Sequence, residues 1–143
     1  MKIATWNVNS IRKREAIVLD WLAANDPDVL LLQETKVIDA SFPRQSFAAK
    51  GYQLALAGEP GRNGVAIISR HPIDDVTRGL PGDDDDTQAR YIEATIQGLR
   101  IASVYVPNGT STESPNFPYK LTFYDRLRQR AAAHLEAETP YVI

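Results

Sequence analysis

Apolar and polar residues fall into blocks along the chain, and the first blocks predict a β-α-β unit. Residues 2–6 are apolar enough for a strand, and the apolar run at 28–32 is too short for a helix, which favours a fully buried strand. Between them, apolar side chains recur at helical spacing, at Ile17, Val18, Trp21 and Leu22. Asn9 or Ser10 is placed to cap this helix, and residues 25–27 are placed to end it.

This crossover predicts two parallel strands whose carboxyl ends lie on one edge of a sheet. Asn7 and Asn9 follow the first strand, and Glu34 follows the second. We therefore expect these side chains to converge at that edge.

Further apolar segments predict strands at residues 52–57, 65–69, 73–78, 91–96 and 100–106. Pro-Gly and Asn-Gly pairs in residues 58–64, and Gln97-Gly98, indicate the turns of two hairpins. Residues 37–49 form a connector, with one helical turn expected near residues 46–50. Pro107 closes the last strand because proline cannot donate to a sheet ladder.

A helix is predicted from Pro118, which suits a first helical turn. Its expected buried face consists of Leu121, Tyr124, Leu127, Ala131 and Leu135. Residues 141–143 are typical of the opening of another strand. Because domains seldom end inside an apolar strand, we expect residues 1–143 to be the N-terminal part of one longer domain, truncated at its C-terminus.

The composition predicts a folded globular chain, with 143 residues, 43% hydrophobic and 24% charged. It contains no cysteine, which excludes disulfide scaffolds and thiolate metal sites. No signal peptide or membrane-length apolar stretch is present, so we expect no membrane association and a cytoplasmic location. The net charge of −2 gives no bulk attraction to nucleic acid, which would have to bind a local basic patch.

Glu34 is the first candidate for chemistry, because a carboxylate that follows a buried strand is costly unless it is paired or binds a cation. It can be a Mg²⁺ ligand, since Mg²⁺ commonly takes only one or two protein carboxylates. It can also be a surface residue or a partner of Lys36. Asn7 and Asn9 can orient a metal-bound water or a phosphate, or serve only as helix caps.

Tyr105 ends a strand just before Pro107, which can direct its hydroxyl over the same edge as a phosphate donor. Packing as a core aromatic is the alternative. Asn108 follows Pro107 in a turn, and it can simply be a residue that tolerates the left-handed conformation there. The acidic run at residues 83–86 lacks the ligand spacing of a calcium loop and is expected to be solvated. His71 and His134 have no partners at the spacing of a catalytic triad.

Four motifs resemble the exonuclease III family in order and spacing: residues 6–12 (WNVNSIR), 27–36 (PDVLLLQETK), 64–69 (GVAIIS) and 105–109 (YVPNG). Residues 79–84 and 117–124 are similar to further stretches of that family. The resemblance implies the endonuclease/exonuclease/phosphatase fold, of class α+β, a four-layer α-β-β-α sandwich of which this chain forms half. It also implies apurinic/apyrimidinic endonuclease and 3′→5′ exonuclease activity in duplex DNA repair.

By the same resemblance, Glu34 would bind Mg²⁺, or Mn²⁺ as an alternative, with Asn9 near its hydration shell. Asn7 would hold the catalytic hydrogen-bond network and Tyr105 would contact the scissile phosphate. The DNA-binding residues would be Asn108, Arg90 and Lys36. The partner would be duplex DNA with abasic sites or 3′ ends, and no obligate protein partner is expected.

The resemblance stops before the family's Gly-Asp-Phe/Met-Asn, Asn-Asp and Ser-Asp-His motifs, so the general base is not in this chain. We therefore expect the 143 residues to be inactive alone and to aggregate or seek a partner. Two alternatives stay open. One is a phosphodiesterase or phosphatase of the same fold that acts on lipid or small-molecule phosphates, and the other is a non-catalytic fragment with weak DNA binding.

Overall fold

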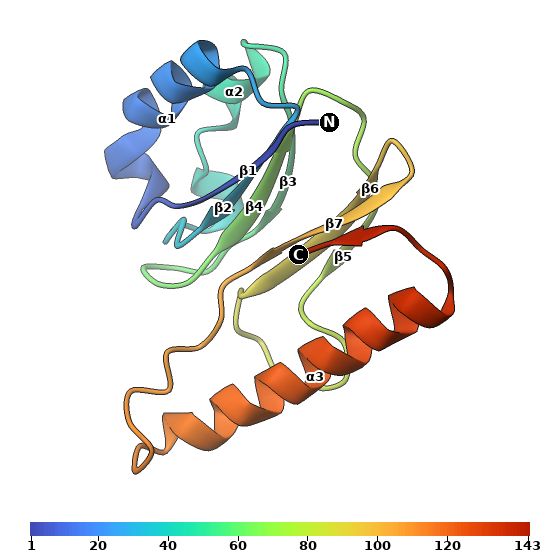
Figure 1. Ribbon diagram of the computed structural model, residues 1–143. Coiled ribbons are helices and arrows are strands. Elements are labelled where there is room, and N and C mark those ends of the chain that lie inside the picture. Colours follow the sequence, from blue (N-terminus) through green and yellow to red (C-terminus); the bar gives the residue numbers. More distant parts are fainter.

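The computed structural model describes residues 1–143 and contains two four-stranded sheets (Figure 1). The first sheet has the strand order β1-β2-β4-β3. Its elements, with the helices between them, are β1 Ile3–Asn7, α1 Ile11–Asn25, β2 Val29–Gln33, the 3-10 turn Asp39–Ser41, α2 Arg44–Ala48, β3 Gln53–Ala57 and β4 Val65–Ser69.

The second sheet has the order β5-β6-β7-β8. Its elements are β5 Asp74–Arg78, β6 Tyr91–Ile96, β7 Leu99–Val104, α3 Asn116–Glu136 and β8 Tyr141–Val142. β8 lies parallel to β7, whereas β5, β6 and β7 are antiparallel neighbours.

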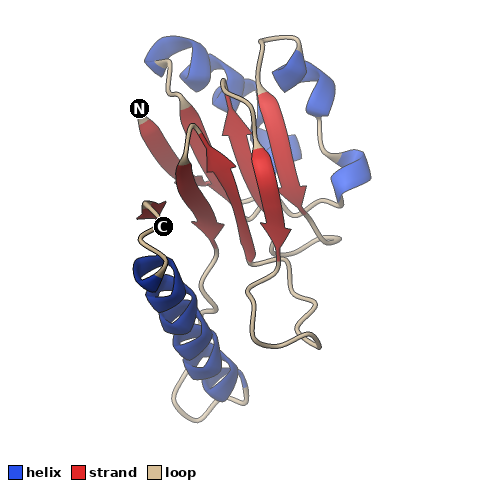
Figure 2. Ribbon diagram, turned by 90° about the vertical axis from the view of Figure 1, so that its right-hand side faces the viewer, coloured by secondary structure: helices blue, strands red, loops and turns tan.

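The two sheets face each other, and helices cover their outer faces (Figures 1 and 2). α1 and α2 lie on the first sheet, and α3 lies on the second. The resulting order of layers is α-β-β-α, so the predicted fold class is confirmed. Both hairpins are also confirmed, with β3 paired to β4 and β6 paired to β7.

β2 shows why the sequence forms a sheet buried on both sides, because all five of its residues are buried. Leu30 and Leu32 pack toward α1, while Val29 and Leu31 pack toward the second sheet. Burying each of these side chains contributes about 1.5–3 kcal/mol relative to leaving it exposed. The predicted strand therefore forms the middle of the molecule.

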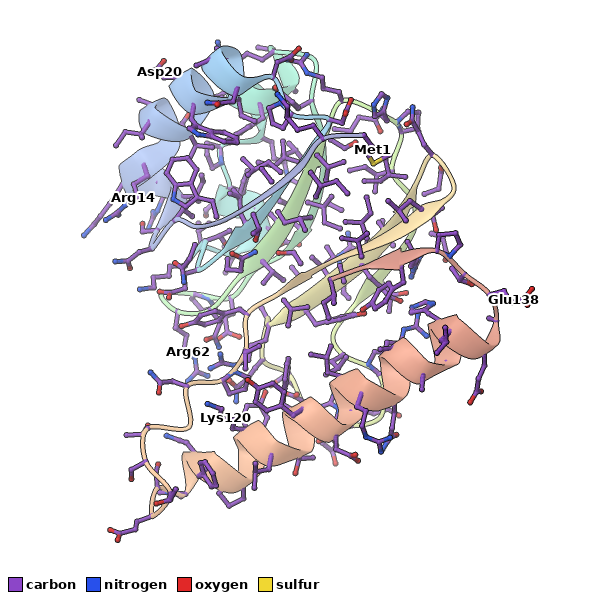
Figure 3. All side chains as sticks on the ribbon, viewed as in Figure 1. Met1, Arg14, Asp20, Arg62, Lys120 and Glu138 are labelled. Atoms are coloured by element: carbon purple, nitrogen blue, oxygen red, sulfur yellow. The ribbon has the colours of Figure 1, made fainter.

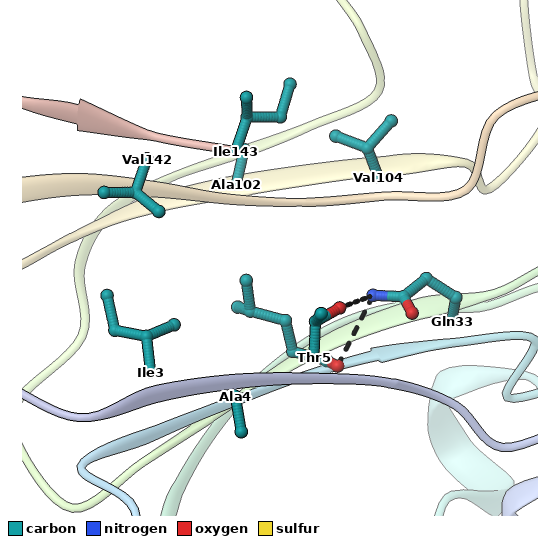
Figure 4. Close-up of a pocket in the computed structure, with 9 residues that line it drawn as sticks. Ile3, Ala4, Thr5, Gln33, Ala102, Val104, Val142 and Ile143 are labelled. Atoms are coloured by element: carbon teal, nitrogen blue, oxygen red, sulfur yellow. Dashed lines mark hydrogen bonds between the residues drawn. The ribbon is translucent and has the colours of Figure 1, made fainter.

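The apolar space between the sheets remains open beside the edge strands β1 and β8. It forms a cavity of about 360 Å³ lined mainly by apolar side chains (Figure 4). Gln33 is its principal polar group. Its amide donates to Thr5 Oγ1 at 3.0 Å and to Ser103 Oγ on β7 at 3.1 Å, so the two sheets are joined there by hydrogen bonds.

The predicted helix from Pro118 is present as α3. Of its expected buried face, Leu127 does pack against the core, but three other residues do not. The side chains of Leu121, Tyr124 and Leu135 are exposed, and the buried residues are Phe123, Arg126 and His134. The polar pair can be buried because each side chain meets a carboxylate. Hydrophobic periodicity alone does not reveal such pairs.

One of those carboxylates also corrects the expectation of a solvated acidic run. Asp83, Asp84 and Asp85 are exposed, but Asp86 accepts from Arg126 Nη1 at 2.7 Å and from the Tyr119 hydroxyl at 3.1 Å. The run is therefore tied to α3 at its last residue.

Candidate active site

Asn7 and Glu34 meet where β1 and β2 end. The strands pair in parallel, with Asn7 opposite Gln33, so the next residues on both chains leave the same edge of the sheet. There the Asn7 amide donates to Glu34 Oε1 at 2.7 Å, and Asn7 Oδ1 accepts from the backbone N–H of Asn9 at 3.1 Å. The predicted convergence of these residues is confirmed. We refer to this edge as the rim.

Lys36 completes the group at the rim. Its ammonium lies 2.8 Å from Glu34 Oε2 and donates to Asn9 Oδ1 at 2.6 Å. Pairing of Glu34 with Lys36 was one of the alternatives that the sequence left open, and the structure contains that pair. The ammonium thus occupies a position between two oxygen atoms that could also hold a metal ion.

The backbone around these side chains is strained. Asn9, Ser10, Glu34 and Lys36 have positive φ angles of 43°, 88°, 55° and 55°, a conformation that non-glycine residues rarely adopt. Such strain persists only where the surroundings enforce it, and it gathers at functional sites. Here the Ser10 N–H donates to the Glu34 carbonyl at 2.7 Å, which locks the two strand ends together.

This geometry overturns the expectation that Asn9 or Ser10 caps α1. Ser10 occupies the capping position, but its side chain makes no capping hydrogen bond. The N–H of Ile11 instead donates to the carbonyl of Thr35. The Asn9 side chain is therefore free to face Lys36.

The electrostatics of the rim keep the Glu34 carboxylate ionised. Its pKa is lowered by hydrogen bonds from Lys36 and Asn7, which outweigh the opposing effect of partial burial. The side chain is only 18% exposed. A negative oxygen centre is therefore held in a partly dehydrated position, where it attracts cations more strongly than in water.

Tyr105 follows β7 and directs its hydroxyl to the same carboxylate. Burial raises the pKa of Tyr105, and its hydrogen bond to Glu34 raises this pKa further. The phenol is consequently a neutral hydrogen-bond donor at the rim. The guanidinium of Arg90 stacks over the Tyr105 ring in a cation–π contact, with its Cζ 4.9 Å from the ring centroid. The structure thus brings both residues to the group around Glu34.

Arg90 is held by residues that the sequence did not single out. Its Nε donates to Gln88 Oε1 at 2.7 Å. One residue away, the Ala89 N–H donates to the Glu59 carboxylate at 2.7 Å, and the Ala89 carbonyl accepts from the Gly64 N–H. The two contacts of Ala89 join loops that are distant in sequence, so no local pattern could have indicated them.

Gly64 allows the β3–β4 turn to lie directly against the segment that contains Thr35 and Lys36. Its φ is +89°, and a Cβ atom there would collide with the Thr35 side chain. The turn also fixes the segment that carries Lys36, since the Lys36 N–H donates to the Asn63 carbonyl at 2.9 Å. The turn therefore supports both Lys36 and Arg90.

Asn108 is the candidate that the structure leaves outside the group. It lies in the loop after β7, and its side chain accepts only from the Thr110 N–H at 3.3 Å. Its carbonyl accepts from Lys120. Lys120, Arg62 and Arg14 all lie on the left side of Figure 3. Arg14 contacts the rim directly, because its Nη1 donates to the Asn9 carbonyl at 2.6 Å.

Comparison with known proteins decides the family. Residues 4–143 match the model of the Endonuclease/Exonuclease/phosphatase family. The chain belongs to this family. Exodeoxyribonuclease III of Haemophilus influenzae is 32% identical over 148 residues, which span 100% of this chain and 55% of that relative. The chain therefore spans about half the length of this curated relative.

Solved structures agree with this assignment. A 3′ phosphatase, NExo, from Neisseria bound to a product DNA hairpin superposes with a TM-score of 0.93 at 41% identity, over 95% of this chain and 53% of that one. An AP endonuclease from Archaeoglobus fulgidus gives 0.85 at 46% identity, over 89% and 49% of the two chains. Similarity to exonuclease III relatives is thereby confirmed.

The donor atoms at the rim of this family member suit a hard divalent cation. Glu34 Oε2 and Asn9 Oδ1 already converge on the positive charge of Lys36. No group of three or more His, Cys, Asp or Glu side chains is arranged around a common centre. A site with one carboxylate and one amide oxygen matches Mg²⁺, which commonly retains several waters, better than a metal that needs a full protein cage.

The rim lacks a second carboxylate or an imidazole. His71 lies beside Asp28 at 3.0 Å, at the opposite end of β2, and His134 contacts Glu93 beneath α3. The hydrogen-bonding side chains around Glu34 are an amide, an ammonium and a phenol. None of these is suited to accept a proton from water at neutral pH.

None of the helices has the length and apolar character that a membrane span would need.

Proposed function

We propose that this chain supplies the metal-binding and phosphate-binding part of an enzyme that hydrolyses phosphodiester bonds in duplex DNA. One observation carries the proposal: Glu34, Asn7, Asn9, Lys36 and Tyr105 meet at a single rim. The whole chain would serve as part of one domain, and the complete protein would act as an apurinic/apyrimidinic endonuclease and 3′→5′ exonuclease.

In this proposal, Glu34 and Asn9 hold Mg²⁺, with Mn²⁺ as an alternative ion. A bound Mg²⁺ ion supplies neutralisation of phosphate charge and a water of lowered pKa. Asn7 keeps the Glu34 carboxylate in place through its 2.7 Å hydrogen bond. Such supporting contacts commonly change metal affinity by about 10-fold to 100-fold.

Tyr105 and Arg90 are proposed to bind the DNA phosphates. The neutral phenol donates a hydrogen bond, while the guanidinium adds charge beside it and can bind a phosphate through two N–H groups. Lys36 and Asn108 are proposed to contact the backbone on either side. Abasic sites and 3′ ends are the proposed substrates, since relatives are named exodeoxyribonuclease III and AP endonuclease.

A second candidate concerns the 143 residues by themselves, which would bind metal and DNA without turnover. It is favoured by the absence of a proton acceptor among the side chains that contact Glu34. Hydrolysis would then need a general base from outside these residues. Binding and incision must therefore be measured separately.

The experiment uses fluorescence anisotropy with a duplex that carries one abasic site, in Mg²⁺, and compares wild type with Glu34→Gln. We expect wild type to bind with affinity that falls steeply with salt, because phosphate contacts release counterions. Glu34→Gln should remove the Mg²⁺-dependent part of that affinity. Glu136→Gln, an exposed change at the end of α3, is the matched control.

Two further measurements distinguish the candidates. Tighter binding of inositol phosphates than of the duplex would favour a phosphatase of this fold instead. A denaturing gel of the bound duplex reports incision: binding without incision supports the non-catalytic candidate, and incision that requires Glu34 excludes it. Equal DNA binding by wild type and Glu34→Gln at every Mg²⁺ concentration would remove the basis of the proposal.

A further inference from the structure

The Lys36 ammonium lies at the point of the rim where a divalent cation would bind. Its nitrogen lies 2.8 Å from Glu34 Oε2 and 2.6 Å from Asn9 Oδ1. These are the two side-chain oxygens that face a common point at the rim. The Lys36 ammonium therefore lies between the two oxygens that are proposed to hold a divalent cation.

This arrangement is built by the backbone. Residues 34 and 36 both adopt positive φ, and the N–H groups of Thr35 and Lys36 donate to the carbonyls of Gly64 and Asn63. The tight turn directs the lysine back over the carboxylate two residues earlier. The ammonium ends a flexible stem and is 30% exposed, so it can leave without moving the turn.

The ammonium and a divalent ion compete for the same atoms. Mg²⁺ binds oxygen at about 2.0–2.1 Å, so a metal on Glu34 Oε2 and Asn9 Oδ1 would lie where the ammonium now is. Two positive charges at such a separation repel each other strongly in a partly dehydrated site. The ammonium and a divalent ion therefore cannot contact these two oxygens at the same time.

We propose that Lys36 is an exchangeable internal counter-ion, which neutralises Glu34 without metal and is displaced onto a DNA phosphate when a divalent cation binds. The proposal rests on the proposed metal site at Glu34. It gives Lys36 two roles that follow one another. Before metal binding, it prevents an unpaired carboxylate from repelling DNA, and afterwards it contributes a phosphate contact beside the metal.

The test is an Mn²⁺ titration followed by electron paramagnetic resonance of the free ion, with wild type, Lys36→Met and Glu34→Gln. Removal of the competing charge should tighten Mn²⁺ binding by about tenfold or more in Lys36→Met. The same variant should bind duplex DNA more weakly, with a salt dependence reduced by about one phosphate contact. Lys50→Met, an exposed lysine without a side-chain contact, should change neither quantity.

The outcomes separate this inference from the proposed function. If Glu34→Gln abolishes Mn²⁺ binding but Lys36→Met binds no tighter than wild type, the exchange is wrong and the metal site stands. If wild type and Lys36→Met both fail to bind Mn²⁺, both proposals fail.

A second measurement does not depend on affinity. The ¹⁵Nζ signal of Lys36 should show slowed proton exchange without metal and lose that protection when Mg²⁺ is added. A signal that keeps its protection at saturating Mg²⁺ would contradict the displacement.

Discussion

The side-chain amide of Asn7 donates a 2.7 Å hydrogen bond to Glu34 Oε1, across the ends of two parallel strands. This bond leaves the other carboxylate oxygen, Oε2, directed at the ammonium of Lys36. Asn7 therefore determines which oxygen of Glu34 is available to a cation, although Asn7 itself does not contact the ammonium.

Replacing Asn7 with Ala should weaken Mn²⁺ binding by about tenfold, because the Glu34 carboxylate loses the donor that orients it. Calorimetric titration with Mn²⁺ measures this change. Asn116→Ala provides the control, since Asn116 is exposed and its side chain makes no hydrogen bond. Unchanged Mn²⁺ affinity in Asn7→Ala would show that Glu34 needs no orienting donor.

The ionisation of Tyr105 should depend on Glu34. Burial and the hydrogen bond to Glu34 raise the pKa of the phenol, so it stays protonated at a pH where an exposed tyrosine has begun to ionise. In Glu34→Gln the pKa of Tyr105 should fall toward its ordinary value. The ¹³Cζ chemical shift of Tyr105, followed against pH, measures it. An identical titration in both proteins would place the hydroxyl elsewhere.

Glu59 should position Arg90 for DNA without contacting DNA itself. In Glu59→Ala the Ala89 N–H loses its acceptor, so the segment that carries Arg90 should loosen. We expect loss of the protected Arg90 Nε–H signal and about tenfold weaker duplex binding. The Arg130 Nε–H, bonded to Glu93 beneath α3, is the internal control, and Glu136→Ala is the control variant.

The Arg90 and Arg130 signals together distinguish a local effect of Glu59→Ala from unfolding. An intact Arg90 signal in Glu59→Ala would contradict the positioning role. Loss of both the Arg90 and the Arg130 signals would mean that the variant is unfolded, and Glu59→Gln, which keeps one acceptor oxygen, would then replace it.

Glu93 should be essential to stability. It is fully buried and pairs with Arg100 at 2.7 Å and also with Arg130 and His134. Burial opposes its ionisation, but the hydrogen bonds from Arg130, Tyr91, Arg100 and His134 outweigh burial and lower the pKa of Glu93 to about 2. Glu93→Ala should reduce the free energy of unfolding by about 3–5 kcal/mol, because it removes the buried carboxylate that Arg100 and Arg130 share.

The sign of the pH dependence follows from that lowered pKa. The unfolded carboxyl binds protons near its ordinary pKa of 4.5, while the folded one does so only near about 2. Its stabilisation is therefore complete above the ordinary pKa and is lost as the pH falls toward about 2. Urea titrations of wild type and Glu93→Gln across this range measure the difference. Parallel pH profiles for the two proteins would contradict it.

The sequence predicted those parts of the fold whose signals are local. The turn residues around Asn63 and Gly98 located both hairpins, and the crossover between the first strands placed Asn7 and Glu34 at one edge. Hydrophobic spacing also located α3. The buried face of α3 was predicted only in part. Arg126 and His134 are buried by pairing with Asp86 and Glu93, and partners so far apart in sequence leave no periodic signal.

The candidate site was predictable to a similar extent. Motif similarity and strand ends indicated Glu34, Asn9, Lys36 and Tyr105, which the structure brings together. The role of Glu59 depends on loops that approach only in the folded chain, so Glu59 could not be identified from its neighbours in sequence. The function of Asn108 stays a prediction, since its side chain makes only a local turn contact.

The metal site at Glu34 and Asn9 is tested most directly by a crystal structure of the chain, from crystals soaked in Mn²⁺, with anomalous scattering to locate the ion. We expect an anomalous peak within coordination distance of Glu34 Oε2 and Asn9 Oδ1, with the Lys36 ammonium displaced from both oxygens. A peak that lies away from Glu34, or no peak while Lys36 keeps its contacts with Glu34 and Asn9, would contradict it.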